Sequence, residues 1–152
     1  MLKQKLKEDL SRALKESDKI KLSVLRMLLA AISNKEKEKR YKEGSEELTE
    51  EETVCVIISE AKKRKEAASE YEKGGRPELA EKEKQELQVL KKYMPEQMSE
   101  EELKKTAEKI IEEIGAAGPK DTGKVMQELM KKVKGRADGA LAGKIVREFL
   151  SK

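Results

Sequence analysis

Apolar residues recur every three or four positions along most of the chain, the spacing that places them on one face of an α-helix. The first such stripe consists of Leu2, Leu6, Leu10 and Leu14, and it predicts a helix from Leu2 to about Glu16. The same spacing predicts six further helices, whose apolar stripes span Ile20–Ile32, Val54–Tyr71, Leu79–Met94, Leu103–Ile114, Val125–Val133 and Leu141–Leu150. Because few runs of β-branched residues are present to build strands, we expect an all-α fold.

Cap and break signals separate these helices. Thr49 and Ser99 each stand three residues before a glutamate, the capping-box pattern in which hydroxyl and carboxylate satisfy free backbone amides at a helix start. Gly135 is placed to end the sixth helix in the left-handed conformation, and Asp138 is placed to cap the seventh. Pro95 ends the fourth helix, because a proline disfavours helical backbone in the residue before it.

The break at Pro95 divides the chain into two predicted parts. We expect an N-terminal helical subdomain over residues 1–95 and a C-terminal three-helix subdomain over residues 96–152. Within the first, the third and fourth helices contain long polar stretches, Lys62–Glu66 and Ala80–Glu86. We therefore expect these two helices to form a long hairpin in the N-terminal bundle, stabilised by ion pairs one turn apart.

Composition limits the chemistry that this chain can perform. Charged residues make up 43% of it and aromatic residues 3%, and histidine is absent, so Ser-His-Asp and Cys-His mechanisms are excluded within one chain. The single cysteine, Cys55, stands among apolar residues, and we interpret it as a small buried core residue. Without a His/Cys cluster or EF-hand spacing, we expect no metal, no cofactor and no intrinsic catalysis.

The segment Gly118–Lys124 matches the first seven positions of the phosphate-binding P-loop pattern. The next residue is Val125, whereas a P-loop has a Ser or Thr there to bind magnesium. Pro119 lacks an amide that the loop would need, and the segment follows a predicted helix instead of a strand. We therefore interpret it as a loop that begins a helix.

Positive charge is concentrated near the C-terminus. Residues 119–152 contain nine basic and four acidic residues, whereas residues 49–118 carry a net charge of −5. Basic side chains beside a helix N-terminus can bind phosphates, and the candidate nucleic-acid-binding residues are Lys124, Lys131, Lys132, Lys134, Gly135, Arg136, Lys144 and Arg147. Helix capping also explains Gly135 and Asp138, so the spacing leaves open whether this turn binds phosphate or is only a capped corner.

Targeting signals are not recognisable in the sequence. Met1–Leu10 is charged throughout, unlike a signal peptide, and the longest uncharged run, Met27–Asn34, is too short to cross a bilayer. One cysteine cannot form an internal disulfide, as is usual in a reducing compartment. We expect a bacterial, cytoplasmic, monomeric protein with no membrane partner.

Several segments together identify a family resemblance: Leu22–Leu28, Lys62–Ala67, Leu79–Glu83, Leu90–Gln97, Gly123–Met126, Ile145–Val146 and, most specifically, Lys134–Gly139. Through them the chain resembles the YqeY family of the GatB/YqeY group, nearly from end to end. One departure is Gly143, where an asparagine is common in the family. A glycine inside a helix costs about 1 kcal/mol relative to alanine.

The resemblance implies a two-part helical fold and kinship with the C-terminal tail of the B subunit of the tRNA-dependent glutamine amidotransferase. That enzyme converts misacylated Glu-tRNA or Asp-tRNA to the amide form, and its tail helps to hold the tRNA while other domains perform the chemistry. A carbon–nitrogen ligase activity with glutamine as amide donor follows from this kinship at the level of the family. The residues of this chain provide neither the ATP site nor the nucleophile that such a ligase requires.

Two functional hypotheses remain open from the sequence. In the first, the protein is an accessory protein that binds tRNA or other structured RNA through its basic C-terminal helices. In the second, it is an adaptor that docks on an amidotransferase or an aminoacyl-tRNA synthetase through its acidic helical hairpin. A third hypothesis, an amidotransferase in its own right, would require Cys55 to act as a nucleophile without a histidine.

Overall fold

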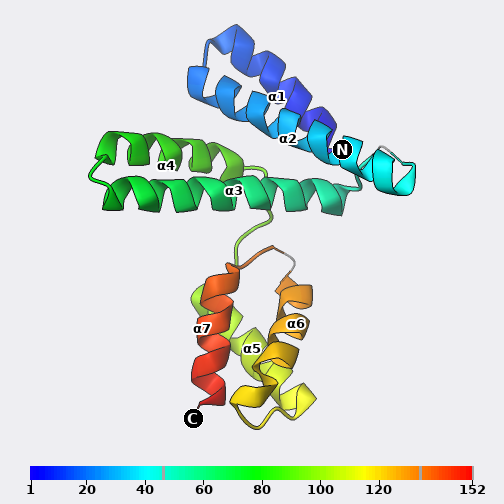
Figure 1. Cartoon of the computed structure of the whole chain (residues 1–152), viewed down its shortest axis with the longest axis vertical. Helices are drawn as coiled ribbons and strands as arrows, with labels where there is room; N and C mark the ends of the chain where they lie inside the picture. The colour runs from blue at the N-terminus through cyan, green and yellow to red at the C-terminus, as the bar shows by residue number, and fades with distance from the viewer. Residues whose placement is uncertain (46, 134, 152) are drawn as a thin grey trace. The chain divides into compact units, whose positions relative to one another are not determined.

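The computed structural model describes residues 1–45, 47–133 and 135–151, which form seven α-helices, one short 3₁₀-helix and no strand, so the all-α prediction is confirmed (Figure 1). The helices are α1 (Leu2–Glu16), α2 (Lys19–Glu43), α3 (Glu50–Lys73), α4 (Pro77–Lys91), α5 (Glu100–Ile114), η1 (Pro119–Asp121), α6 (Thr122–Val133) and α7 (Gly139–Leu150). The chain divides into two compact units, Met1–Met94 and Pro95–Lys152. None of the described helices is both long and apolar enough to cross a membrane.

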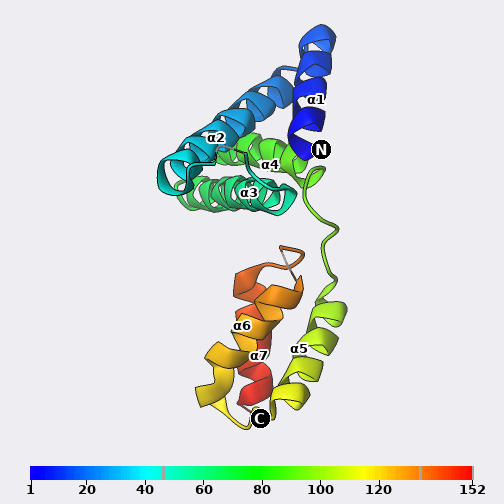
Figure 2. The same cartoon turned by 90° about the vertical axis from the view of Figure 1, so that its right-hand side faces the viewer.

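Two antiparallel hairpins, α1–α2 and α3–α4, make up the N-terminal unit (Figures 1 and 2). Helices α2 and α3 are central in this unit, because each of them contacts all three other helices. Each helix contributes a narrow apolar stripe to the interior. The buried residues of this core are Leu6, Ala13, Val24, Leu25, Leu28, Ile32, Ile57, Ala61, Leu90 and Tyr93.

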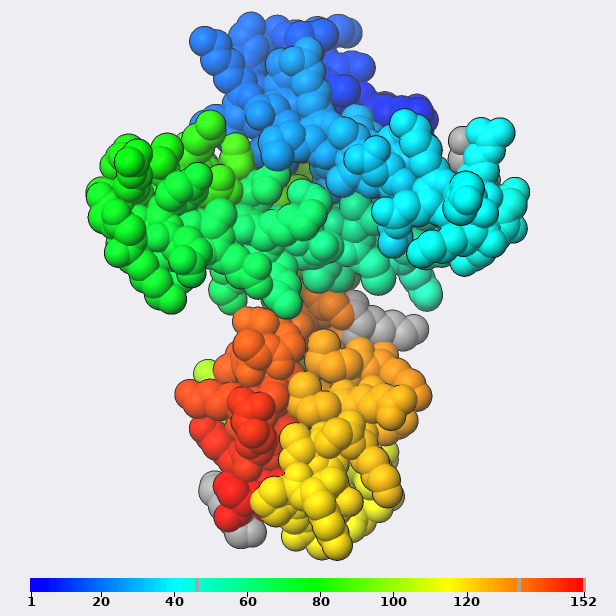
Figure 3. All heavy atoms as spheres, in the orientation of Figure 1, coloured from blue at the N-terminus to red at the C-terminus, as the bar shows by residue number. Residues whose placement is uncertain are grey.

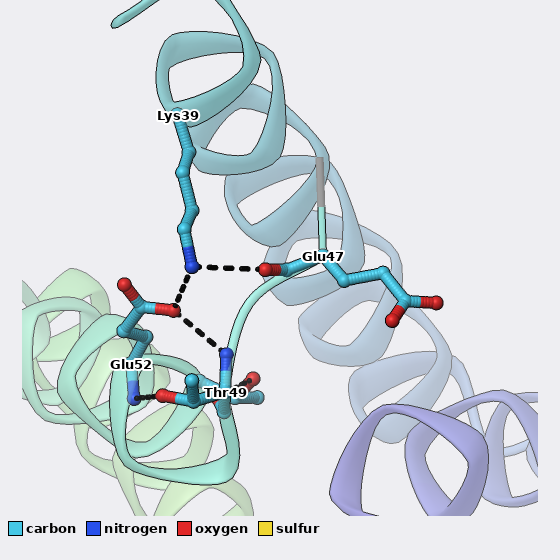
Figure 4. Close-up of polar contacts among 5 residues, drawn as sticks. Lys39, Glu47, Thr49 and Glu52 are labelled. Atoms are coloured by element: carbon cyan, nitrogen blue, oxygen red, sulfur yellow. Dashed lines mark hydrogen bonds and ion pairs between the residues drawn. The ribbon is translucent and has the colours of Figure 1, made fainter. Parts of the chain in front are cut away.

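The start of α3 is fixed by a capping box that also binds α2 (Figure 4). The amide of Glu52 donates to Thr49 Oγ1 at 3.1 Å, and Glu52 Oε2 accepts from the Thr49 amide at 2.7 Å. Lys39 Nζ, from α2, donates to the same oxygen at 2.7 Å and to the Glu47 carbonyl oxygen at 3.0 Å. The hydrogen bond from Lys39, and then that from Thr49, lower the pKa of the Glu52 carboxyl. The second predicted box, at Ser99, is also formed.

Leu14 and Cys55 are exposed, contrary to expectation, as are Ile20 and Ile114 at the ends of their stripes, and the geometry of the helix explains the first two. Leu14 is 59% exposed, because a strict four-residue repeat drifts around a helix of 3.6 residues per turn, and Ala13 takes the buried position instead. Cys55 is exposed as well. Helix α3 buries Thr53 and Ile57, and Cys55 lies about 200° around the helix from each of them.

A buried hydrogen bond joins the first helix to the last turn of the N-terminal unit. The Tyr93 hydroxyl donates to Asp9 Oδ2 at 2.6 Å, and each residue is only 8% exposed. Asp9 has a further partner in Arg12, whose Nη1 lies 3.5 Å from Asp9 Oδ1. Burial, and then the hydrogen bond to Asp9, raise the pKa of the Tyr93 hydroxyl above its ordinary value. The hydroxyl therefore remains protonated and available as a donor.

The polar stretches of α3 and α4 pack around Arg64. Its Nε lies 3.1 Å from Glu86 Oε2 and 3.8 Å from Glu83 Oε2, and its Nη2 lies 3.7 Å from Glu60 Oε2. Glu60 also pairs with Lys63 at 2.9 Å. Among the described residues, the buried Glu83 Oε2 has no hydrogen-bond partner. Burial, and then the charge of Glu86, raise the pKa of the Glu83 carboxyl, so its ionised form opposes folding.

We expect Tyr93→Phe to lower the free energy of unfolding by about 1–3 kcal/mol, because the Asp9 carboxylate stays buried with one hydrogen bond fewer. Urea titration followed by circular dichroism measures the change. Tyr41→Phe is the control, since Tyr41 is 93% exposed, and it should leave the unfolding curve unchanged. Equal losses in the two variants would contradict the role of this hydrogen bond.

We expect Glu83→Gln to raise the melting temperature at neutral pH. A carboxyl whose pKa is raised on folding stabilises the fold below its unfolded value of 4.5 and loses that contribution as the pH rises through the folded pKa. Glutamine mimics the neutral form, so its advantage should shrink in acid, where Glu83 of the wild type becomes protonated. Thermal unfolding across a pH series measures this, with the exposed Glu81→Gln as control. A gain that is independent of pH would refute the explanation.

Candidate nucleic-acid interface

Helices α5, α6 and α7 pack around the apolar core of the C-terminal unit. Its buried residues are Leu103, Ala107, Ile110, Val125, Leu129, Val133, Ala142, Ile145, Val146 and Leu150. On α6 the buried residues repeat every fourth position, which leaves Lys124 and Lys131 on the solvent side. On α7 the same geometry leaves Lys144 and Arg147 exposed. The core thus determines which predicted basic residues face solvent.

These four cations, Lys124, Lys131, Lys144 and Arg147, define what we call the α6–α7 surface. The two helices lie side by side in the space-filling view, with α5 mostly behind them (Figure 3). Lys131 Nζ lies 3.3 Å from Glu128 one turn earlier on the same helix. Lys124, Lys144 and Arg147 form no ion pair with any other residue that the structure describes. Three of the predicted binding residues are therefore free to bind anions.

Lys132, unlike these four residues, points toward α5. Its Nζ lies 3.5 Å from Glu113 Oε2, so it connects α6 to α5. Helix α5 carries most of the acidic residues of this unit, and those that are exposed on it are Glu100, Glu101, Glu102, Glu108, Glu112 and Glu113. The C-terminal unit therefore has most of its glutamates on α5, whereas α6 and α7 carry Lys124, Lys144 and Arg147, which have no ion pair among the described residues.

The turn between α6 and α7 is bonded to the segment that precedes α5. Arg136 Nε donates to the Glu96 carbonyl oxygen at 3.0 Å, and the Met98 amide donates to the Arg136 carbonyl oxygen at 2.8 Å. Gln97 Nε2 donates to the Gly135 carbonyl oxygen at 3.2 Å. Lys134 lies outside the described residues. Sequence reasoning missed this contact, because Glu96 is 40 residues from Arg136 and no local pattern links them.

Both helix ends at this turn have the predicted capping geometry. Gly135 has a φ of +79°, in the left-handed region, and Asp138 Oδ1 accepts from the Ala140 amide at 3.0 Å. These observations favour the interpretation of the turn as a capped corner. Arg136 and Gly135 have structural partners, whereas the free cations lie along the helices on either side of the turn.

The P-loop-like segment has the geometry of a helix start. Gly118 is extended, and Pro119–Asp121 forms one 3₁₀ turn after α5. Asp121 Oδ2 accepts a hydrogen bond from the Ala117 amide at 3.1 Å. A carboxylate therefore occupies the loop at which a P-loop presents amides to phosphate.

The N-terminal unit has an open groove of about 960 Å³ between α2 and α3, which sequence reasoning missed. Ala31 and Asn34 of α2 and Cys55 and Ser59 of α3 contribute to its walls. Periodicity carries no signal for it, because a groove depends on how two helices diverge. Within the described residues, no group of three or more acidic or cysteine side chains could hold a metal ion.

Three yeast proteins are similar to this chain, and each is named "Altered inheritance of mitochondria protein 41, mitochondrial". The protein from Candida glabrata is 28% identical over 116 residues, which cover 75% of this chain and 62% of the relative. The protein from Vanderwaltozyma polyspora is 34% identical over 90 residues, which cover 59% of this chain and 46% of the relative. The protein from Lachancea thermotolerans is 27% identical over 154 aligned positions, which cover 97% of this chain and 80% of the relative. The chain spans less than two thirds of the length of the first two relatives.

These relatives contradict two expectations from the sequence, a bacterial source and a cytoplasmic location. All three come from yeasts, and all three have the word mitochondrial in their names. The expectation relied on the lack of a recognisable signal peptide or bilayer-length apolar run and on the single cysteine. A lone cysteine excludes only an internal disulfide, and it does not distinguish one compartment from another.

The resemblance inferred from the sequence segments is confirmed by comparison with protein families. The match is continuous and includes both compact units of the chain. It covers residues 3–150, and the chain therefore belongs to the family described as Yqey-like protein.

Proposed function

We propose that this protein is an accessory protein that binds structured RNA, such as tRNA, through its α6–α7 surface. The observation that carries the proposal is the set of free cations on that surface. Lys124, Lys144 and Arg147 face solvent and have no ion pair among the described residues, and six of the eleven acidic residues of the unit lie on α5. Cations without acidic partners are available to replace the counterions of a phosphate backbone.

The chemistry of this surface favours contacts with phosphates over contacts with unpaired bases. Single-strand readers stack bases on exposed aromatic rings. The one aromatic residue of the C-terminal unit is Phe149, which is half-buried in the core. Recognition would therefore depend on the arrangement of backbone phosphates in a folded RNA.

The family resemblance connects this binding function to tRNA-dependent amidation. The chain has no histidine, and its one thiol belongs to α3, in the other unit. We infer that the protein holds or delivers tRNA while a partner amidotransferase or synthetase performs the reaction. The carbon–nitrogen ligase activity associated with the family would then belong to that partner.

A second candidate function is that of a protein adaptor acting through the α3–α4 hairpin. The specific observation is the internal pairing of Arg64 with Glu83 and Glu86, which joins the two helices while other carboxylates of the hairpin face solvent. The exposed acidic residues of the hairpin include Glu66, Glu70, Glu78 and Glu81. Such a surface would repel RNA and fit a basic protein surface.

We expect Lys124→Glu combined with Lys144→Glu to weaken the binding of total tRNA at least about tenfold at low salt, because two phosphate contacts become repulsive. Filter binding across a salt series measures the affinity and its salt dependence, which should also become less steep. The matched control is Lys105→Glu combined with Lys109→Glu on α5, with the same change in net charge. Equal losses in the two double variants would show that only net charge matters and would refute the proposed surface.

Affinity capture from lysate, with and without ribonuclease, distinguishes the two candidate functions. If RNA binding is the function, we expect most captured proteins to be lost after ribonuclease treatment. They should also be lost with the Lys124→Glu, Lys144→Glu variant. Partners that resist ribonuclease and are lost instead on Glu78→Lys, Glu81→Lys substitution would support the adaptor.

A further inference from the structure

Gly143 occupies a position in α7 where the backbone does not require glycine. The helix runs through it from Gly139 to Leu150, and it is not among the residues with positive φ. Inside a helix, glycine is less favourable than alanine. Gly143 is nevertheless buried, so something covers it.

The group that covers Gly143 is the guanidinium of Arg147, one turn later on the same helix. A Cβ placed on Gly143 would lie 3.3 Å from Arg147 Nη1, 3.8 Å from Cζ and 3.9 Å from Nη2. Apart from the adjoining residues and the backbone of the helix itself, these are the three atoms nearest to that position. Side chains on a helix tilt toward its N-terminus, so residue 147 extends over residue 143. The absent side chain of Gly143 makes a slot, and the guanidinium lies in it.

Other helical glycines of the C-terminal unit lack such a contact. A Cβ on Gly123 would meet no atom within 4 Å, and a Cβ on Gly139 would meet only Met130 Cε at 3.9 Å. The slot is therefore specific to the pair of Gly143 and Arg147. Arginine is otherwise a long side chain with many rotamers, and ordering it on binding reduces affinity.

We propose, on the basis of the RNA-binding function above, that Gly143 is a positioning residue for that function. Its missing side chain holds the Arg147 guanidinium against α7 in one orientation, beside Lys144, ready to donate to an RNA phosphate. An alanine at this position moves the guanidinium outward by a few tenths of an ångström and removes the slot. The Gly143→Ala substitution should therefore raise the stability of the helix and lower the affinity for RNA.

The test compares the full-length wild type with Gly143→Ala, using total tRNA as the probe in filter binding across a salt series. We expect Gly143→Ala to raise the melting temperature by about 2–4 °C, because alanine favours the helix. We expect the same variant to bind tRNA about three- to tenfold more weakly, because Arg147 is no longer ordered in advance. The salt dependence of binding should remain as steep as in the wild type, since no charge is removed.

Two further variants separate positioning from general effects. Gly123→Ala is the matched control, and it should raise stability without changing affinity, because its Cβ meets no neighbouring atom. Arg147→Ala should weaken binding and make the salt dependence less steep by about one phosphate contact. In an Arg147→Ala background, Gly143→Ala should have no further effect on affinity, because the group that it positions is gone.

Each outcome supports the proposal or overturns it. Wild-type affinity in Gly143→Ala would overturn the role of Gly143 and leave RNA binding intact. If Gly143→Ala lowers the tRNA affinity equally in the wild-type and Arg147→Ala backgrounds, the glycine acts through some other group. A wild type that binds no tRNA would overturn the RNA-binding function itself, and the positioning role with it.

Discussion

Each helix of this protein buries only a narrow apolar stripe, and the scarcity of apolar surface is the constraint on which the rest of the structure depends. Hydrophobic residues make up 36% of the chain and charged residues 43%. Between α3 and α4, the contact is made in part by charged side chains, because the largely buried Arg64 pairs with Glu83 and Glu86. Helix ends are fixed by polar contacts, as at Thr49 and Arg136. The same scarcity leaves most of each helix surface to charged side chains, from which the candidate RNA surface is made.

Local signals were sufficient to predict the helices and many of their ends. The capping boxes at Thr49 and Ser99 and the cap at Asp138 each depend on residues within three positions of one another. Residues at that spacing meet at the start of any helix, whatever packs against it later. The left-handed conformation of Gly135 follows in the same way from its place after a helix.

Contacts between residues far apart in the sequence could not be predicted in this way. The pattern around Arg136 indicates only a basic turn, and its hydrogen bond to Glu96 depends on how three helices pack. For the candidate site, the sequence identified the basic residues and their helices. It could not indicate that Lys132 is paired with Glu113 and that Lys144 has no ion pair with another described residue, because pairing depends on which helix faces pack together.

The hydrogen bond between Tyr93 and Asp9 spans 84 residues, and this separation affects how the protein folds as it is synthesised. A ribosome adds about 5–20 residues per second, so Tyr93 follows Asp9 by about 4–17 s. Once α2 is complete at Glu43, the α1–α2 hairpin exists without its final partners for the rest of that interval, and the apolar faces around Leu6 and Leu25 are uncovered. The N-terminal unit can close only after almost all of it has been made. A nascent chain halted before Tyr93 would therefore present an open hairpin to the chaperones at the ribosomal exit.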